Sequence, residues 1–400
     1  MCEAHILVIP FPAQGHIIPL IKLSHQLVKH GIKVTFVNID FVHNQIMKSS
    51  LGEGVADHNN YKDAMIELVS IPDGLEDGDN RSLLLGKLTE STCKVMPKKL
   101  EMLIEDINKS NNNNNNNGNK ISCLVIDENF GWGIEVAKKM GIRAVAFWPA
   151  SASLLALHFN IQKLLDDGLI VANDRNMNNI SVKLADWIIC NTNYDYEPAT
   201  FDFAPQIIPI GPILATNDHV GSFWPEDSSC LNWLDQQETN SVIYVAFGSV
   251  TIFDHSQLQE LALGLELSNR PFLLVIRADI NNGKNQSFLK EFEERVFPFG
   301  KVVQWAPQEK VLSHPSIACF ISHCGWNSTM EGVVNGVPFL CCPYFADQFF
   351  NQTLICDAWK VGLRLVPMDG IILTREEIAC KIQKLFHEGE FKVMAMERNQ

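Results

Sequence analysis

The sequence predicts an α/β protein with two doubly wound parallel sheets, one in each half of the chain. Short apolar runs alternate with stretches of helical periodicity along its length. The first such unit, residues 5–38, has the order strand, helix, strand, and its right-handed crossover implies a parallel sheet with helices on both faces. A stretch rich in Pro and Gly near the middle separates the two series.

The first half opens with a buried strand at residues 5–11, HILVIPF. The segment PAQG ends this strand, and apolar residues from Ile17 to Val28 share one helical face before Gly31 ends the helix. A second strand follows at residues 32–38. Further strands are predicted at residues 121–127, 142–148 and 185–191.

The apolar periodicity stops at residues 215–226, which we predict to be an interdomain linker. It separates two Rossmann-like domains, residues 1–214 and 227–400. Strands of the second domain are predicted at residues 241–249, 271–277, 317–322 and 337–343. Ligands of such sheets bind at the carboxyl ends of the strands, so we expect the two domains to face a cleft.

The composition excludes several classes of partner. The 400 residues carry a formal charge of -14 and no cluster of Lys and Arg, which argues against nucleic acid and anionic membranes. The 11 cysteines form no CxxC pair, and the N-terminus has no basic region or cleavage site typical of a signal peptide. No apolar run reaches membrane-spanning length. We expect a reduced, cytoplasmic protein, by default a monomer.

Motifs for common nucleotide cofactors are absent, since neither GxGxxG nor GxxxxGK[ST] occurs. Instead, HCGWNSTMEG (residues 323–332) joins an apolar strand to a helix. Asn327 or Ser328 is the expected N-cap, and the helix N-terminus, with His323, is suited to bind a diphosphate. Glu331 can accept the two hydroxyl protons of a ribose. Alternatively, Ser328 is only a cap and Trp326 belongs to the core.

Two residues of the first domain suit acid–base catalysis. His16 lies at the start of the first helix, whose positive end favours the neutral imidazole that a base requires. Asp127 ends a strand at the same carboxyl edge and can orient that imidazole. Each residue could also be a simple helix cap or a core residue, and the diphosphate site favours the catalytic interpretation.

The segment from Trp305 to Gln348 resembles the signature box of the plant family 1 UDP-glycosyltransferases. It matches in the opening WAPQ, the central HCGWNS, the following glutamate and the closing DQ. The similarity extends to PFPAQGHIIPL near the N-terminus and to VIYVAFGSV. It implies the two-domain glycosyltransferase B fold, in which residues 1–214 bind the acceptor and residues 227–400 bind the UDP-sugar.

The resemblance also implies roles for individual residues. His16 and Asp127 would be the catalytic pair, and Trp305 would stack on uracil while Ala306 contributes backbone contacts. Donor contacts would come from Gln308 and Glu331 to the ribose, from Ser249, His323, Asn327 and Ser328 to the diphosphate, and from Trp326, Asp347 and Gln348 to the sugar. A Gln at the end of the box favours glucose.

The expected reaction is an inverting transfer of glucose from UDP-glucose to a hydroxyl or carboxyl group of a small lipophilic acceptor. Neither a metal nor another cofactor is required, because a helix N-terminus can stabilise the departing diphosphate. Phe11, Phe130 and Trp148 lie near strand ends and could line an acceptor pocket, or could equally be core residues.

Two departures from the family favour an alternative. Between residues 164–170 and 182–190 the chain is shorter than its relatives, and it ends at Gln400 within a helical pattern. A nucleotide-sugar binder that cannot position an acceptor is therefore the competing function. A glycosidase using Asp127 and Glu331 is a weaker alternative, since each carboxylate already has a better role.

Overall fold

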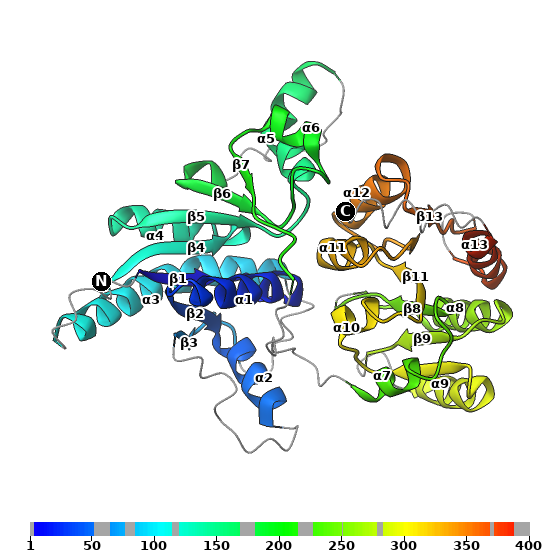
Figure 1. Ribbon diagram of the computed structural model, residues 1–400. Coiled ribbons are helices and arrows are strands. Elements are labelled where there is room, and N and C mark those ends of the chain that lie inside the picture. Colours follow the sequence, from blue (N-terminus) through cyan, green and yellow to red (C-terminus); the bar gives the residue numbers. More distant parts are fainter. Residues whose placement is uncertain are drawn as a thin grey trace. The chain divides into compact units, whose positions relative to one another are not determined.

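The computed structural model describes residues 4–51, 65–76, 85–113, 120–168, 181–214, 227–249, 251–277, 283–368 and 372–387. The chain divides into two compact units, residues 1–223 and 224–400. In each unit the strands pair in parallel and helices pack against the sheet (Figure 1), which confirms the predicted fold class. The predicted linker, residues 215–226, and most of the shortened segment, residues 169–180, lie outside the described residues.

Unit 1 contains a seven-stranded sheet in the order β3-β2-β1-β4-β5-β6-β7. After β3 the chain returns to pair β4 with β1, so the winding direction reverses between β1 and β4. The strands are β1 (His5–Ile9), β2 (Lys33–Ile39), β3 (Ile66–Ile71), β4 (Ile121–Asp127), β5 (Arg143–Trp148), β6 (Trp187–Cys190) and β7 (Ile207–Pro209).

Helices connect these strands. They are α1 (Gln14–Lys29), α2 (Asp40–Leu51), α3 (Leu85–Asn113), α4 (Trp132–Lys139), α5 (Ala152–Asp166) and α6 (Pro198–Phe203). The apolar face predicted for the first helix is confirmed, because Ile17, Leu20 and Ile21 of α1 are buried. No helix in the described part of the chain is long and apolar enough to cross a membrane.

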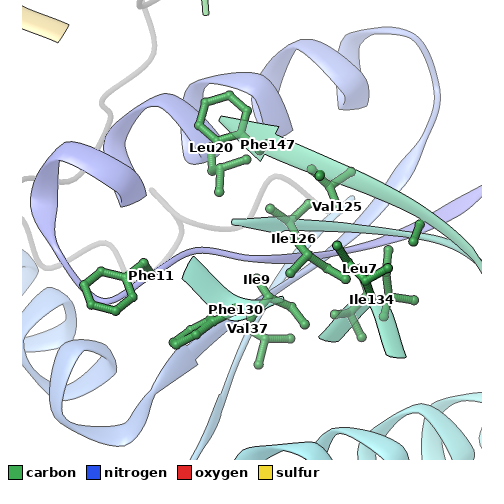
Figure 2. Close-up of a cluster of buried hydrophobic side chains, with 14 of the residues drawn as sticks. Leu7, Ile9, Phe11, Leu20, Val37, Val125, Ile126, Phe130, Ile134 and Phe147 are labelled. Atoms are coloured by element: carbon green, nitrogen blue, oxygen red, sulfur yellow. The ribbon is translucent and has the colours of Figure 1, made fainter. Parts of the chain in front are cut away.

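The core of unit 1 lies between its sheet and helices. Leu7 and Ile9 of β1, Val125 and Ile126 of β4, and Leu20 of α1 gather in one cluster (Figure 2). Strands that are apolar on both faces are typical of a parallel sheet covered on both sides.

Three aromatic residues considered for an acceptor pocket belong to this core. Phe11, Phe130 and Trp148 are all buried, and Figure 2 labels the first two within the cluster. They support the strand ends instead of forming an open pocket.

Unit 2 repeats the same winding in a six-stranded sheet, in the order β10-β9-β8-β11-β12-β13. Its direction reverses between β8 and β11, the counterparts of β1 and β4. The strands are β8 (Val242–Ala246), β9 (Phe272–Val275), β10 (Gly300–Val303), β11 (Ile317–Ser322), β12 (Phe339–Cys341) and β13 (Gly362–Arg364).

The helices of unit 2 bury aliphatic and phenylalanine side chains against its sheet. They are α7 (Ser229–Leu234), α8 (His255–Leu267), α9 (Gly283–Val296), α10 (Gln308–Leu312), α11 (Trp326–Val334), α12 (Gln348–Thr353) and α13 (Arg375–His387). α11 follows β11 after a loop of three residues. The segment HCGWNSTMEG, residues 323–332, therefore lies where the winding direction reverses.

Candidate active site

His16 occupies the first turn of α1, as the sequence predicts. β1 ends at Ile9, and the short loop after it leads to Ala13, the N-cap residue, which makes no side-chain cap. The backbone N–H of His16 donates to the carbonyl of Ala13 at 2.9 Å, a tight first turn. The His16 side chain is 23% exposed, so one edge of the imidazole is available to a substrate.

Asp127 ends β4 and contacts His16 directly. Its Oδ2 lies 2.8 Å from His16 Nδ1, and its side chain is fully buried. The other carboxylate oxygen, Oδ1, accepts from the backbone N–H of Asn129 at 3.1 Å and from its side-chain amide at 3.3 Å. Because a carboxylate only accepts hydrogen bonds, Nδ1 carries the proton, and the lone pair of neutral His16 is on Nε2.

Neighbouring groups hold and tune this pair. The Phe11 ring lies 5.2 Å from the His16 ring, centroid to centroid, and supports one side of the imidazole. Glu128 follows Asp127 in a 3₁₀ turn, Glu128–Phe130. Burial, reinforced by the charge of Asp127, raises the pKa of Glu128 to about 7, while His16 acts in the opposite direction. Sequence analysis missed this third titratable group.

In unit 2, the segment HCGWNSTMEG forms a tight loop after β11 and most of helix α11. The predicted N-cap residue of this helix is wrong. Gly325 is the N-cap residue of α11, in extended conformation and without a side-chain cap. Cys324 before it takes the left-handed conformation, with φ 62°. Asn327 and Ser328 are therefore the second and third residues of the helix. The first backbone N–H groups of a helix have no partner within it, so this terminus suits an anion.

His323 lies in the loop between β11 and α11, held between two glycines. A Cβ atom on Gly248 would come within 2.6 Å of His323 Nε2, and one on Gly325 within 2.4 Å. Desolvation lowers the pKa of His323 to about 4, although a backbone hydrogen bond with Ala246 acts in the opposite direction. His323 is therefore neutral at physiological pH and can serve a diphosphate as a hydrogen-bonding group without a charge.

Three of the predicted donor residues form one hydrogen-bonded group. The side-chain amide of Gln308 donates to Ser328 Oγ and to Glu331 Oε2, both at 2.8 Å. Its carbonyl oxygen accepts from the hydroxyl of Tyr244 at 3.2 Å. The structure thus brings Gln308 of α10 to the first turns of α11, and it adds Tyr244, which sequence analysis missed. These hydrogen bonds fix the rotamers of the group, and its contact with a ribose remains a prediction.

Trp305 and Ala306 precede α10 in the loop after β10. The carbonyl of Trp305 accepts from the backbone N–H of Asp227 at 2.9 Å, which fixes the loop. The Trp305 side chain is partly exposed, whereas Ala306 is buried. Uracil stacking on Trp305 remains a prediction.

The closing DQ pair lies at the start of α12. Asp347 Oδ2 accepts from the side-chain amide of Asn351 at 2.8 Å. Gln348 is 4% exposed, and its carbonyl oxygen accepts from the backbone N–H groups of Tyr344 at 2.7 Å and Phe345 at 3.1 Å. Gln348 therefore shapes the preceding loop with its oxygen, so an interaction with sugar would use its NH₂ group.

Trp326 does not fit its predicted role as well. Its side chain is only 3% exposed, and its ring lies 6.2 Å from that of Trp359, centroid to centroid. This burial favours the alternative in which Trp326 is a core residue at the start of α11.

Ser249 lies in the turn after β8, as expected for a residue at the carboxyl edge. Arg277, two residues beyond β9, donates from Nη1 to the carbonyls of Gly248 at 3.3 Å and Thr251 at 3.1 Å. Sequence analysis missed this arginine, although its place at the end of the predicted strand, residues 271–277, was a usable signal. Within the described residues, no group of three or more His, Cys, Asp and Glu could hold a metal ion.

Comparisons with known proteins match both units. Residues 3–61 match the family described as "Glycosyltransferase, N-terminal domain", and residues 212–399 match "UDP-glucoronosyl and UDP-glucosyl transferase". The chain is 44% identical to UDP-glycosyltransferase 83A1 of Arabidopsis thaliana, over 99% of this chain and 91% of the relative. It is 31% identical to 7-deoxyloganetin glucosyltransferase of Catharanthus roseus, over 96% and 88%.

Solved structures show the same fold. A UDP-glucosyltransferase from Polygonum tinctorium superposes with a TM-score of 0.80 at 25% identity, over 99% of this chain and 93% of that one. Os79 from O. sativa gives 0.81 at 24% identity, over 98% and 94%.

The alignment with 83A1 is 442 positions long, whereas the chain has 400 residues. The chain is therefore shorter than this relative over the aligned region. Three observations agree. The chain has two units of the glycosyltransferase B type, His16 and Asp127 are hydrogen-bonded, and the identity to a relative extends over almost the full length of the chain. The chain belongs to the plant family 1 UDP-glycosyltransferases and is a glycosyltransferase.

Proposed function

We propose that the chain transfers glucose from UDP-glucose to a hydroxyl or carboxyl group of a small lipophilic acceptor, with inversion at the anomeric carbon. The observation that carries this proposal is the 2.8 Å contact between His16 Nδ1 and Asp127 Oδ2. It fixes the tautomer in which Nε2 can take a proton, at a histidine that is partly exposed.

His16 acts as the general base. Nε2 takes the proton of the acceptor hydroxyl while its oxygen attacks the anomeric carbon from the face opposite UDP. The buried carboxylate of Asp127 holds the ring and stabilises the imidazolium that forms. Proton removal and attack occur in one displacement, and the product therefore has the opposite anomeric configuration.

Unit 2 binds the donor and stabilises the leaving group. Gln308 and Glu331 hold the ribose, and Trp305 stacks on uracil with backbone contacts from Ala306. Ser249, His323, Asn327 and Ser328 surround the diphosphate, and the N-terminus of α11 opposes its growing negative charge. Because this stabilisation comes from backbone dipoles and neutral side chains, we propose that transfer proceeds without a metal ion or other cofactor.

The sugar and the compartment are finer proposals. Asp347 and the NH₂ group of Gln348 would bind the sugar hydroxyls, and the name of a relative that is a glucosyltransferase supports glucose. The acceptor is a phenolic, flavonoid or terpenoid compound, proposed from the family resemblance alone. We further propose a cytoplasmic protein that acts as a monomer.

A second candidate function rests on the length of the chain. The alignment with 83A1 is 442 positions long and the chain has 400 residues, so some residues of the relative have no counterpart here. If they are needed to hold an acceptor, the chain binds UDP-glucose without transferring the sugar.

The deciding experiment measures UDP released from UDP-glucose by the 400-residue chain, with flavonoid, simple phenol and terpenoid acceptors. His16→Ala provides the background. Acceptor-dependent release that vanishes in this variant supports the transferase, and ¹H NMR of the glucoside tests inversion. Binding of UDP-glucose with no release above the variant, for every acceptor, would favour the binder. Parallel assays with UDP-galactose and with EDTA test the sugar and the independence from metal.

A further inference from the structure

Arg277 is a buried cation at the edge of the unit 2 sheet where ligands are expected. It follows β9 by two residues, and its side chain is 5% exposed. Among the described residues of unit 2, no other lysine or arginine is buried. Burying a charge is costly unless its partners compensate, and a guanidinium group stays charged in proteins.

The contacts of Arg277 connect it to the predicted diphosphate site. Its Nη1 donates to the carbonyls of Gly248 and Thr251, which lie on either side of Ser249. The charge therefore draws together the backbone that carries Ser249. Each bond is charge-assisted, which makes it stronger than one between neutral groups.

The turn held by Arg277 lies directly against His323. Gly248 has φ +70°, a conformation that favours glycine, and a Cβ atom there would come within 2.6 Å of His323 Nε2. The position of this turn thus sets the distance between Ser249 and His323, two groups from different strands that are assigned to the same diphosphate.

We propose that Arg277 is a positioning residue for the diphosphate. It fixes the turn at Gly248 and Ser249 against His323, and it places a permanent positive charge behind that turn. This inference rests on the donor site proposed above and names the part of the donor on which Arg277 acts. In a chain with a net charge of -14, this charge provides a local positive potential, and its hydrogen bonds to Gly248 and Thr251 hold it in place.

A purely structural role predicts a different result. If Arg277 only stabilised unit 2, its loss would weaken binding of UDP and of uridine by the same factor. If it acts on the diphosphate, uridine binding will be nearly unchanged, because uracil and ribose are assigned to Trp305, Gln308 and Glu331. The ratio of the two affinities therefore separates the two roles.

Two variants and one control form the test. Arg277→Met removes the charge, and Arg277→Lys keeps the charge while losing the planar guanidinium. Arg375→Met is the matched control, since Arg375 is also in unit 2 and its Nε donates to Glu260 Oε2 at 3.1 Å, joining α13 to α8. Affinities for UDP and uridine are measured by calorimetry and by displacement, and kcat and KM for UDP-glucose by UDP release.

Arg277→Met is expected to bind UDP about tenfold more weakly or worse, as for a lost hydrogen bond to a charged group, with uridine affinity changed by less than about threefold. Arg277→Lys should lie between wild type and Arg277→Met, and Arg375→Met should leave the ratio unchanged. Should Arg277→Met not fold, Arg277→Lys gives the same test with a smaller shift in the ratio.

The inference would be overturned if Arg277→Met lost affinity for UDP and for uridine by the same factor, or if neither affinity changed. If the wild-type chain does not prefer UDP to uridine, the donor site itself is refuted and the inference fails with it. If the ratio shifts as expected but no acceptor is glycosylated, the role of Arg277 stands and the transferase proposal fails.

Discussion

The two units place different groups at the same position in the winding. In unit 1 the direction reverses between β1 and β4, where His16 after β1 meets Asp127 at the end of β4. In unit 2 it reverses between β8 and β11, where Gly248 after β8 meets His323 after β11. Each reversal thus brings a histidine into contact with a residue from the neighbouring strand.

The partner of each histidine decides what the site can do. A buried carboxylate fixes the proton on His16 Nδ1 and stabilises an imidazolium, as a base requires. Burial leaves His323 neutral, with a pKa of about 4, and the adjacent glycine allows the backbone to approach its ring closely. We therefore propose that the same topology serves proton transfer in unit 1 and anion binding with a neutral histidine in unit 2.

The largest effect is expected at the partner of His16. Asp127→Asn keeps the shape of the side chain but removes its charge, so the imidazolium loses its stabilising partner. We expect kcat to fall about 10²- to 10⁴-fold, the range for acid–base catalysis. Asn129→Ala is the control, because the backbone N–H of residue 129 still binds Asp127 Oδ1. Similar losses in both variants would contradict the role of the charge.

A smaller effect, a loss of UDP affinity, is expected for Gly325→Ala, which crowds His323. Gly325 has φ -62°, which alanine adopts readily, but its Cβ would lie 2.4 Å from His323 Nε2. Crowding of this kind costs about 1–3 kcal/mol of stability, which the protein can relieve by moving the His323 ring away from the site. UDP affinity should then fall, by at most about 150-fold if the whole cost is borne by the bound state. Gly86→Ala, with no atom within 4 Å of the added Cβ, should change nothing. Calorimetry with UDP checks both, and unchanged affinity in Gly325→Ala would exclude His323 from the site.

The ribose contacts should give an effect of about tenfold on uridine and UDP alike. Glu331→Gln removes the charge that accepts from Gln308 and that we propose accepts from the ribose hydroxyls. Turnover at saturating UDP-glucose should change little, in contrast to Asp127→Asn. The KM for UDP-glucose and the affinity for uridine measure this, and a loss confined to kcat would contradict it.

The last prediction concerns stability as a function of pH. The stability of the two units should change in opposite directions as pH rises. The raised pKa of Glu128, about 7, stabilises unit 1 below pH 4.5, and this stability is lost as pH rises to about 7. The lowered pKa of His323, about 4, stabilises unit 2 above pH 6.5, and this stability is lost as pH falls to about 4. Each contribution is at most roughly 3 kcal/mol.

Thermal melts between pH 4.5 and 7.5 measure this contrast. Relative to wild type, Glu128→Gln should gain stability at the upper end of this range, because glutamine has no charge to bury. His323→Asn should gain at the lower end for the same reason. A constant difference across the range, for either variant, would refute the corresponding pKa shift.

The sequence predicted best where apolar runs are long and clearly bounded. β4 and β11 occupy the predicted residues, 121–127 and 317–322, and these strands position Asp127 and His323. The four edge strands, β3, β7, β10 and β13, were not predicted. β3 interrupts its apolar residues with Glu67 and Ser70, and the other three have only three or four residues. The pattern thus located the strands that carry the site more accurately than those at the sheet edges.

The details of the site depended on tertiary structure. Capping preference favoured Asn327 or Ser328, but the left-handed Cys324 turns the chain earlier and makes Gly325 the N-cap. Net charge argued against nucleic acid and anionic membranes as partners and gave no sign that a buried arginine lies beside Gly248. Average properties do not reveal such individual contacts, nor the convergence of Gln308 with Glu331 across 23 residues.

The contrast between the units is tested most directly by measuring UDP affinity and acceptor-dependent turnover on one preparation of His16→Ala. The account predicts UDP affinity within about twofold of wild type, because the donor residues lie in unit 2, and turnover reduced at least about 10²-fold. Turnover that survives the substitution, or a loss of UDP affinity that matches the loss of turnover, would contradict the assignment of base and donor site to separate units.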